Sequence, residues 1–396
     1  MPSGLPAETL IGVVGAGAMG AGIAQVAAQA GHRVLLADAQ EGAVERALTG
    51  IAADLQSLAA KGRLAHSDAD AVKARVQPAP TAGFGGCGLV VEAIVEDLAA
   101  KRALLHGLED VVADDAILAS NTSSLSITAM AAGLKRPERV VGMHFFNPPT
   151  RMKLVEVISG LETSADVAAT VFATAESWGK KPAFAKSTPG FIVNRIARPF
   201  YGEAWRAYTE DAADPATIDA IVRDCGGFPM GPFELMDLIG HDVNLAVSTA
   251  VFEATFGERR YAPSLAQQEL VRAGRLGRKR GRGIYDYREG ATKPPPAVEP
   301  GAEPVKRVVA VGSLGIATPI ITRLEAAGID VVRVQGPRSA QEVSAGWLEI
   351  GPARLMMTDG RPATRRAMEE RHEHLVLFDL ALDYAKTPRL GLARAD

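Results

Sequence analysis

The sequence predicts an α/β fold: a doubly wound parallel sheet, then an all-α helical domain, then a smaller C-terminal α/β extension. Three observations support this prediction. A glycine-rich turn between two strands opens the chain, strand and helix patterns alternate to about residue 186, and helical patterns alone continue to about residue 288. The predicted domains are residues 1–186, 187–288 and 305–396, with a proline-rich linker at 289–304.

The opening stretch, residues 10–38, predicts a strand, a glycine turn, a helix and a second strand. Its glycines form G-x-G-x-x-G, which allows a tight turn, close approach of the backbone to a pyrophosphate and close helix–strand packing. The free N–H groups and the positive end of the helix would face the phosphates. This pattern is typical of a Rossmann dinucleotide-binding unit. The predicted cofactor contacts in the turn are Gly15, Gly17, Ala18, Met19 and Gly20.

Asp38 ends the second strand of this unit, eighteen residues after Gly20. A carboxylate at this distance accepts hydrogen bonds from both ribose hydroxyls of adenosine and repels a 2′-phosphate. The predicted cofactor is therefore NAD rather than NADP. The alternative, a small-residue helix packed on a strand without a ligand, is disfavoured by the two flanking strands and the acid.

Composition excludes several classes of protein. A chain of 396 residues is too long for one compact core, and a net charge of −3 gives no reason to expect nucleic acid or an anionic membrane as partner. Cys87 and Cys225 have neither metal-ligand nor disulfide-framework spacing, which predicts core residues in a reducing cytoplasm and no metal site. The uncharged run 11–31 has the length of a membrane span, but its glycines and glutamines disfavour one, and no signal peptide or lipidation motif is expected.

Further strands and helices follow Asp38 in alternation. Small hydroxyl residues come directly after the strand at 117–119, in the sequence SNTSS, where an open α/β sheet places its ligand crevice. The alternative is that these residues only cap the next helix, and both interpretations remain open. The other predicted strands are 89–93, 154–158 and 182–185, and the predicted helices are 41–60, 67–75, 98–112 and 165–178.

From Pro189 the pattern is helical only, with one helix opened by Asp214 and a following proline. The basic run at 272–282 has no aromatic stacking platform, so we interpret it as a loop near an anionic ligand or a dimer surface. The extension begins with strand, glycine turn, helix and strand again. The middle glycine and the acid are missing there, so we expect a βαβ domain that does not bind a dinucleotide.

The strongest candidates for catalysis are His144 and Glu156. The histidine is placed in a turn at the end of a strand, and the glutamate lies mid-strand in the apolar run LVEVI. A carboxylate there is costly unless it is paired, and adjacent strands would bring it to the imidazole. The pair would then be a general base with an orienting partner, as alcohol oxidation requires. The alternative for His144 is a hydrogen-bonded histidine of the core, and the alternative for Glu156 is a glutamate on a strand face turned to solvent. For Asn194 the alternative to a functional role is a residue at the start of a helix, and for Asn147 it is a turn residue before proline.

Seven stretches resemble the 3-hydroxyacyl-CoA dehydrogenase family in order and spacing, over about residues 8–288: GAGAMG, VVEAIVEDLAAK, ASNTSSLSIT, GMHFFNPP, MKLVEVI, TPGFIVNR and GFPMGPFELMD. The resemblance implies NAD-dependent oxidation of (S)-3-hydroxyacyl-CoA to 3-oxoacyl-CoA in cytoplasmic fatty-acid or phenylacetate-type degradation. It also implies a homodimer formed through the helical domain. The extension resembles an additional region of longer relatives, in which a second helical module follows.

The resemblance implies roles for individual residues as well. His144 would be the catalytic base with Glu156 as its partner, and Ser123 and Asn194 would contact the substrate and the histidine. The remaining implied residues are Asp38, Glu96, Lys101, Ser123 and Asn147 in the NAD site and Lys61 at the coenzyme A phosphates.

Two other functions remain as alternatives to this activity. One is a related hydroxyacid or sugar-acid dehydrogenase, similar to the lambda-crystallin branch, and the other is a protein that binds NAD without turnover. The role that the resemblance implies for Lys61 separates an acyl-CoA dehydrogenase from a hydroxyacid or sugar-acid dehydrogenase, because only an acyl-CoA substrate offers phosphates to this lysine. Without that role Lys61 is a solvated cap at the end of a helix.

Overall fold

The computed structural model describes residues 3–301, 303, 305–336 and 346–395. The chain divides into two compact units. The first unit comprises residues 1–197 and 250–257, and the second comprises residues 198–249 and 258–396. Within the described residues, no helix has both the length and the apolar character needed to cross a membrane.

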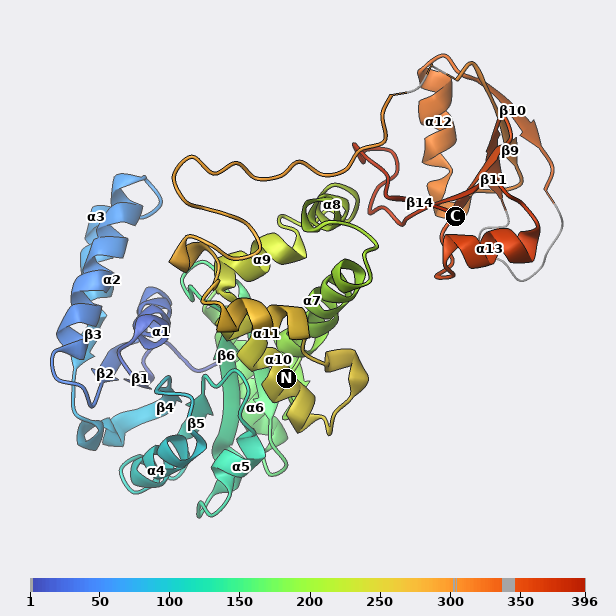
Figure 1. The fold of residues 1–396 in the computed structure, drawn as a ribbon. Coiled ribbons are helices and arrows are strands. Elements are labelled where there is room, and N and C mark those ends of the chain that lie inside the picture. Colours follow the sequence, from blue (N-terminus) through green and yellow to red (C-terminus); the bar gives the residue numbers. More distant parts are fainter. Residues whose placement is uncertain (1–2, 302, 304, 337–345, 396) are drawn as a thin grey trace. The chain divides into compact units, whose positions relative to one another are not determined.

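The first unit contains an eight-stranded sheet in the order β3-β2-β1-β4-β5-β6-β7-β8 (Figure 1). Neighbouring strands are parallel except for β6 and β7, which are antiparallel. The strand order reverses between β1 and β4, so a ligand crevice is expected beyond the carboxyl ends of these strands. The strands are β1 (Leu10–Val14), β2 (Val34–Ala37), β3 (Val76–Pro78), β4 (Cys87–Glu92), β5 (Ile117–Ser120), β6 (Val140–Phe145), β7 (Leu154–Ser159) and β8 (Lys181–Lys186).

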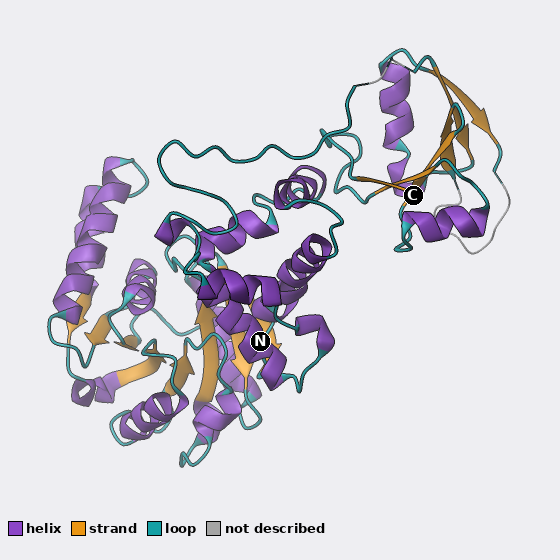
Figure 2. Ribbon diagram, viewed as in Figure 1, coloured by secondary structure: helices purple, strands orange, loops and turns teal. Residues whose placement is uncertain are grey.

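Helices cover both faces of this sheet, and each face has its own apolar core (Figure 2). Alternate residues of one strand enter different cores: Leu89 and Val91 lie in one, and Val90 lies in the other. Burial on both faces explains why these strands are nearly continuous apolar runs. One core includes α1 (Ala18–Gln29), α2 (Ala43–Ala60), α3 (His66–Arg75) and α6 (Ala165–Ser177), and the other includes α4 (Leu98–Glu109) and α5 (Ile127–Ala131).

The helical segment of the second unit begins within α7, which starts at Val193, four residues after the Pro189 at which the sequence predicted the helical pattern to begin. Asp214 caps α8 by accepting hydrogen bonds from the amides of Ala216 and Thr217, as its place before a proline indicated. The basic run forms a loop with one short turn at Arg278–Arg280. The helices are α7 (Val193–Thr209), α8 (Pro215–Ala220), α9 (Pro232–Ile239), α10 (His241–Ala254) and α11 (Leu265–Arg272), with a π-helical turn, η3, at Ile221–Cys225.

The C-terminal extension contains a six-stranded sheet in the order β10-β9-β11-β12-β13-β14. Its first two strands are parallel, and α12 (Pro319–Ala326) lies between them in sequence, which is the predicted βαβ unit. The rest of the sheet is mixed. The remaining elements are β9 (Arg307–Val311), β10 (Asp330–Val334), β11 (Trp347–Ile350), β12 (Ala353–Met357), α13 (Ala363–Glu370), β13 (Leu375–Phe378) and β14 (Leu392–Arg394).

The structure thus confirms the predicted fold class: a doubly wound sheet, a helical segment and a smaller α/β extension. Cys87 and Cys225 are free, buried thiols, as predicted. One local prediction is wrong, because His144 lies inside β6 and not in a turn. The strand continues past this residue because β6 pairs with β7 along most of its length, including the pair His144 and Glu156.

Candidate active site

The glycine turn after β1 leaves open space beside its middle glycine. Gly15 has a φ of 101°, and a Cβ added to Gly20 would lie 1.7 Å from the carbonyl oxygen of Gly15, so the packing of the turn itself requires both glycines. A Cβ added to Gly17 would have no described atom within 4 Å. Gly17 is also the N-cap of α1 and makes no side-chain cap, which leaves the first N–H groups of this helix to a ligand.

Asp38 lies directly beside this turn. One carboxylate oxygen accepts a hydrogen bond from the amide of Ala16 at 2.6 Å, and the other accepts one from the amide of Gln40 at 2.7 Å. Each oxygen of a carboxylate has two acceptor positions, so the group retains capacity for two ribose hydroxyls. The structure therefore places the Asp38 carboxylate directly beside the glycine turn.

His144 and Glu156 form a buried pair on adjacent strands. The distance from Nδ1 of His144 to Oε2 of Glu156 is 2.6 Å, and the two side chains are 7% and 1% exposed. Because an ionised carboxylate can only accept, Nδ1 carries the hydrogen and Nε2 is left free to take a proton. The aromatic rings of Phe146 and Phe191 pack beside the imidazole, with centroids 4.5 and 6.0 Å away.

Glu156 also connects this pair to the start of α7. Its second oxygen, Oε1, accepts hydrogen bonds from the amides of Ile192 and Val193 at 3.0 and 2.8 Å. The next residue is Asn194, whose side-chain amide donates to the carbonyl oxygen of Ser123 at 3.3 Å. Glu156 thereby bonds the side chain of His144 and the backbone that leads into Asn194, and Asn194 in turn contacts the backbone of Ser123.

Glu96 organises the hydroxyl-rich turn after β5. Its Oε1 accepts from the hydroxyl of Thr122 at 2.7 Å and from the amide of Ser123 at 2.9 Å, with longer bonds from Ser124. Burial raises the pKa of Glu96, but these hydrogen bonds and the charge of Lys101 outweigh it and lower the pKa below its ordinary value. The carboxylate is therefore ionised at neutral pH and fixes the turn that carries Ser123.

The structure tests one of the two interpretations of the hydroxyl-rich turn, helix capping. Helix α5 begins only at Ile127, and its N-cap is Ser126, whose hydroxyl accepts from the amide of Ala129 at 3.2 Å. Helix capping by the SNTSS residues is therefore wrong. Their hydroxyls are directed to Glu96 and Glu92 instead, at the carboxyl end of β4.

Lys101 lies beneath this turn and is only 1% exposed. Its ammonium contacts both carboxylate oxygens of Glu92, at 2.9 and 2.8 Å, and lies 3.4 Å from Glu96. Sequence reasoning assigned no role to Glu92, although it lies within the apolar run LVVEAIV, the kind of pattern that singled out Glu156. It also missed Asn121, whose side-chain oxygen accepts from the amide of Phe145 at 2.8 Å and so joins the turn to the strand of His144.

Asn147 is exposed in the loop after β6, and this loop packs against α1. A Cβ added to Gly22 of α1 would lie 2.9 Å from the ring of Pro149. The ammonium of Lys180 donates to the carbonyl oxygens of Pro149 and Met152 at 2.5 and 3.1 Å, and burial lowers its pKa. These contacts fix the loop of Asn147 beside the helix that follows the glycine turn, and neither Gly22 nor Lys180 was found from the sequence.

Lys61 is exposed directly after the last residue of α2. Within the part of the chain that the structure describes, its side chain forms no hydrogen bond or ion pair with the other predicted site residues. This position agrees with the alternative interpretation, in which Lys61 is a solvated cap at the end of a helix. An exposed ammonium also remains available to a phosphate.

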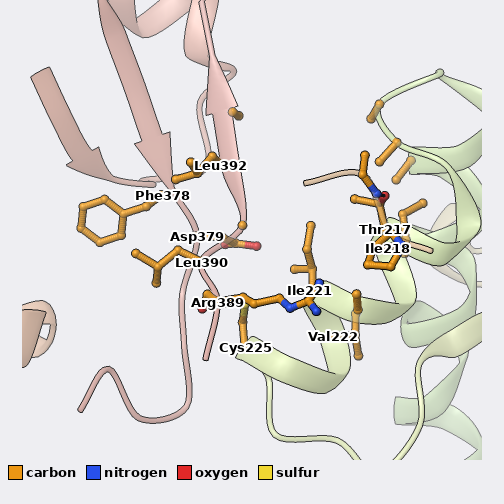
Figure 3. Close-up of a pocket in the computed structure, with 18 of the residues that line it drawn as sticks. Thr217, Ile218, Ile221, Val222, Cys225, Phe378, Asp379, Arg389, Leu390 and Leu392 are labelled. Atoms are coloured by element: carbon orange, nitrogen blue, oxygen red, sulfur yellow. Dashed lines mark hydrogen bonds between the residues drawn. The ribbon is translucent and has the colours of Figure 1, made fainter. Parts of the chain in front are cut away.

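A cleft of about 1310 Å³ lies within the second unit (Figure 3). One side is formed by α8 and η3, including Ile218 and Ile221, and the other by the extension, including Phe378 and Leu392. The two segments are joined by an ion pair of 3.3 Å between Arg389, which lines the cleft, and Asp224. None of the predicted site residues lines this cleft, so we assign it to the junction of helical segment and extension.

Comparison with known families gives three consecutive matches. Residues 10–188 match the NAD binding domain of 3-hydroxyacyl-CoA dehydrogenase, and residues 190–287 match the C-terminal domain of the same family. Residues 355–396 match the reduced Rossmann-fold domain of 3-hydroxybutyryl-CoA dehydrogenase.

Individual relatives agree with these matches. The chain is 53% identical to 3-hydroxyadipyl-CoA dehydrogenase of Escherichia coli over 279 residues, which are 70% of this chain and 59% of that protein. It is 40% identical to 3-hydroxybutyryl-CoA dehydrogenase of Clostridioides difficile, covering 70% of this chain and 99% of that protein. A crystal structure of 3-hydroxybutyryl-CoA dehydrogenase from Escherichia coli aligns with a TM-score of 0.84 at 42% identity, over 99% of this chain and 75% of that chain.

The glycine turn yields a paired prediction. Gly20→Ala places a methyl group against the carbonyl oxygen of Gly15 and is expected to lower the melting temperature. Gly17→Ala meets no described atom and is expected to melt like the wild type, yet to bind NADH about tenfold or more weakly because its methyl group occupies the space beside the turn. Thermal melts and NADH fluorescence titration measure the two effects. Undiminished NADH binding by Gly17→Ala would contradict the assigned position of the pyrophosphate.

The lowered pKa of Glu96 predicts a dependence of stability on pH. The unfolded chain binds a proton at Glu96 more readily than the folded chain, so protonation favours unfolding. The stabilisation by the ionised group is complete above its ordinary pKa of about 4.5 and is lost as the pH falls through the lower folded value. Urea unfolding of wild type and Glu96→Gln from pH 7 to pH 3 should show a stability difference that shrinks with acid. A difference that stays constant would show that the charge of Glu96 does not matter.

Proposed function

Because this chain belongs to the 3-hydroxyacyl-CoA dehydrogenase family, we propose that it oxidises (S)-3-hydroxyacyl-CoA to 3-oxoacyl-CoA with NAD. The observation that supports this activity most directly is the buried pair of His144 and Glu156, 2.6 Å apart. A neutral imidazole oriented by a carboxylate is the general base that removal of a hydroxyl proton requires.

His144 takes the proton of the substrate's 3-hydroxyl group on Nε2, and the oxygen then forms a double bond to C3 as the hydride leaves that carbon. NAD, when bound, supplies the hydride acceptor at C4 of the nicotinamide. Glu156 keeps Nδ1 protonated and stabilises the imidazolium that forms. The products are 3-oxoacyl-CoA, NADH and a proton on His144, which passes to solvent. Asn194 and Ser123 lie in the same network and contact the substrate.

The cofactor site that we propose follows the carboxyl ends of β1, β2, β4 and β5. Gly17 offers open space for the pyrophosphate, Asp38 recognises the adenosine ribose, and Glu96 and Ser123 face the nicotinamide half. Asn147 approaches from the loop packed on α1, and Lys101 lies beneath Glu96. The remaining turn residues of the proposed site are Gly15, Ala18, Met19 and Gly20.

The wider setting of the reaction is part of the same proposal. The names of two relatives, which specify a dicarboxylic and a four-carbon acyl group, support an acyl-CoA substrate in fatty-acid or phenylacetate-type degradation. We place this reaction in the cytoplasm. Residues 1–186 bind NAD, residues 187–288 bind substrate and form a homodimer, and residues 305–396 follow the linker at 289–304 as an extension whose role is not assigned.

Substitution of the base tests the proposed chemistry. His144→Ala should lower the rate of NADH formation from (S)-3-hydroxybutyryl-CoA by about 10²–10⁴-fold, the usual effect of losing a general base. Its affinity for NADH should be unchanged, because the imidazole binds a proton and not the cofactor. Absorbance at 340 nm and NADH titration measure the two quantities.

The matched control is His241→Gln, because His241 is also buried and pairs with a carboxylate, Asp237, at 2.8 Å. It belongs to the core of the helical segment, so its loss should lower stability and leave the turnover number near that of the wild type. A His144→Ala variant as fast as wild type would rule out the assigned base. Equal losses of turnover in the two variants would show that the loss in His144→Ala arises from impaired folding and not from removal of a base.

Charge reversal at Lys61 separates an acyl-CoA substrate from a free hydroxyacid. Lys61→Glu should raise the KM for 3-hydroxybutyryl-CoA by about tenfold while kcat changes little, since a phosphate contact binds ground state and transition state alike. The control, Lys181→Glu, makes the same charge change at an exposed lysine of edge strand β8 and should leave both constants unchanged. An unchanged KM in Lys61→Glu, or turnover of free 3-hydroxybutyrate equal to that of its thioester, would favour the hydroxyacid alternative.

A further inference from the structure

The chain enters α7 through a left-handed turn that holds a bulky side chain. Gly190 has a φ of 73°, and Phe191 after it has a φ of 46°. In the described part of the chain, the other non-glycine residues with a positive φ each follow the end of a helix by one or two residues, where a left-handed residue is common. Those residues are Asp211, Phe256 and Arg371. Phe191 precedes a helix instead, and a residue with a Cβ adopts this backbone only at a cost in free energy.

The turn directs two backbone amides at the carboxylate of Glu156. The amides of Ile192 and Val193 donate to Oε1 at 3.0 and 2.8 Å. A left-handed residue beside helical ones is the backbone arrangement that aims successive N–H groups at one anion. The turn itself is closed by a bond of 2.9 Å from the amide of Phe191 to the carbonyl oxygen of Thr188. Glycine would adopt this backbone without strain, so the backbone alone does not explain a phenylalanine here.

The side chain of Phe191 lies beside the catalytic histidine. The ring is 4% exposed, and its centroid is 6.0 Å from that of the His144 imidazole, with the two planes inclined at 60°. It belongs to the apolar core that includes α4 and α5, so close packing fixes its position. The bond between Nδ1 and Glu156 holds one atom of the imidazole. Packed neighbours are needed to hold the plane of the ring and with it the direction of Nε2.

We propose that Phe191 is a positioning residue for the general base. Its backbone aims the two amides at Glu156, and its ring limits the motion of the His144 imidazole, so that Nε2 stays directed at the substrate. This inference rests on the proposed function in one respect, the assignment of His144 as the base. The competing explanation is a purely structural role, in which turnover falls only as far as stability does.

Two variants of the full chain separate these explanations. Phe191→Ala removes the ring and keeps the strained backbone, whereas Phe191→Gly removes both, so Phe191→Gly should melt at the higher temperature of the two. Assayed well below both melting temperatures, each should lower kcat for (S)-3-hydroxybutyryl-CoA by about tenfold, because the direction of the base matters in the transition state. KM and the affinity for NADH should stay within about twofold of wild type. Phe191→Gly would thus be more stable than Phe191→Ala and no faster.

A matched control comes from the same apolar core. Phe84 is 0% exposed and packs against Gly12 of β1, where an added Cβ would lie 2.6 Å from the ring. Phe84→Ala should lower the melting temperature at least as far as Phe191→Ala but keep kcat within about twofold of wild type. In a His144→Ala background, adding Phe191→Ala should change the residual kcat by less than about twofold, because both changes act through one imidazole.

The orientation of the imidazole can also be measured without turnover. In protein labelled with ¹⁵N-histidine, the Nδ1–H group of His144 gives an NMR signal that is identified by its absence from His144→Ala. This signal should broaden or disappear through exchange with water in Phe191→Gly. The Nε2–H group of His241, which donates to Asp237 at 2.8 Å, should keep its signal and serves as the internal reference.

Each outcome supports or overturns the proposal. Turnover that follows stability, with Phe191→Gly faster than Phe191→Ala, would overturn it. So would a full tenfold loss in the His144→Ala background, an unchanged Nδ1–H signal, or a Phe191→Gly variant that does not fold. If only Phe191→Ala fails to fold, the kcat and the NMR signal of Phe191→Gly give the same decision. A wild-type protein that oxidises no 3-hydroxyacyl-CoA would contradict the proposed activity instead, and the NMR comparison would still decide whether Phe191 holds the imidazole.

Discussion

The candidate site depends on one constraint: a carboxylate buried in an apolar strand must have its charge and lone pairs satisfied by the chain itself. Glu156 meets this constraint with three donors, the imidazole of His144 and the amides of Ile192 and Val193. These donors come from a neighbouring strand and from the segment that leads into α7. One buried group therefore fixes the tautomer of the histidine and the start of the helix that carries Asn194.

The same constraint acts at the end of β4, where Glu92 is satisfied by Lys101 and by the turn after β5. Asn121 connects the two buried carboxylates. Its amide donates to the backbone of Glu92, and its side-chain oxygen accepts from Phe145, the residue after His144. The network thus runs without a break across β4, β5, β6 and β7. Each strand of this series contributes a polar group at the same edge, because β4, β5 and β6 are parallel and β7 pairs with β6 in register.

Local patterns were enough to predict the fold and the first half of the site. The spacing of the glycines and of Asp38 depends on one βαβ unit, so a single stretch of sequence contains the whole geometry. The pairing of His144 with Glu156 was also expected, although the extent of β6 was not, since nothing in the sequence between the two strands shows that they are antiparallel. Glu92 and Asn121 were missed for a different reason. The bonds that tie them to the neighbouring strands, from Ser120 to Glu92 and from Phe145 to Asn121, join residues 28 and 24 positions apart, and only the assembled strand order brings these residues together.

The C-terminal extension and the first unit share a βαβ strand order but differ in the turn after their first strand. Both begin with strand, glycine turn, helix and parallel strand, and in both the backbone of a neighbouring segment lies close to the first glycine of the turn. A Cβ added to Gly336 would lie 2.8 Å from the Cα of Gly312, and one added to Gly346 would lie 2.4 Å from the carbonyl oxygen of Ser313. A Cβ added to Gly15 would likewise lie 2.5 Å from the carbonyl oxygen of Ala93, so close approach of backbone to the first glycine is common to both turns. They differ at the middle position of the glycine pattern, where the first unit has Gly17 with open space beside it and the extension has the buried side chain of Leu314.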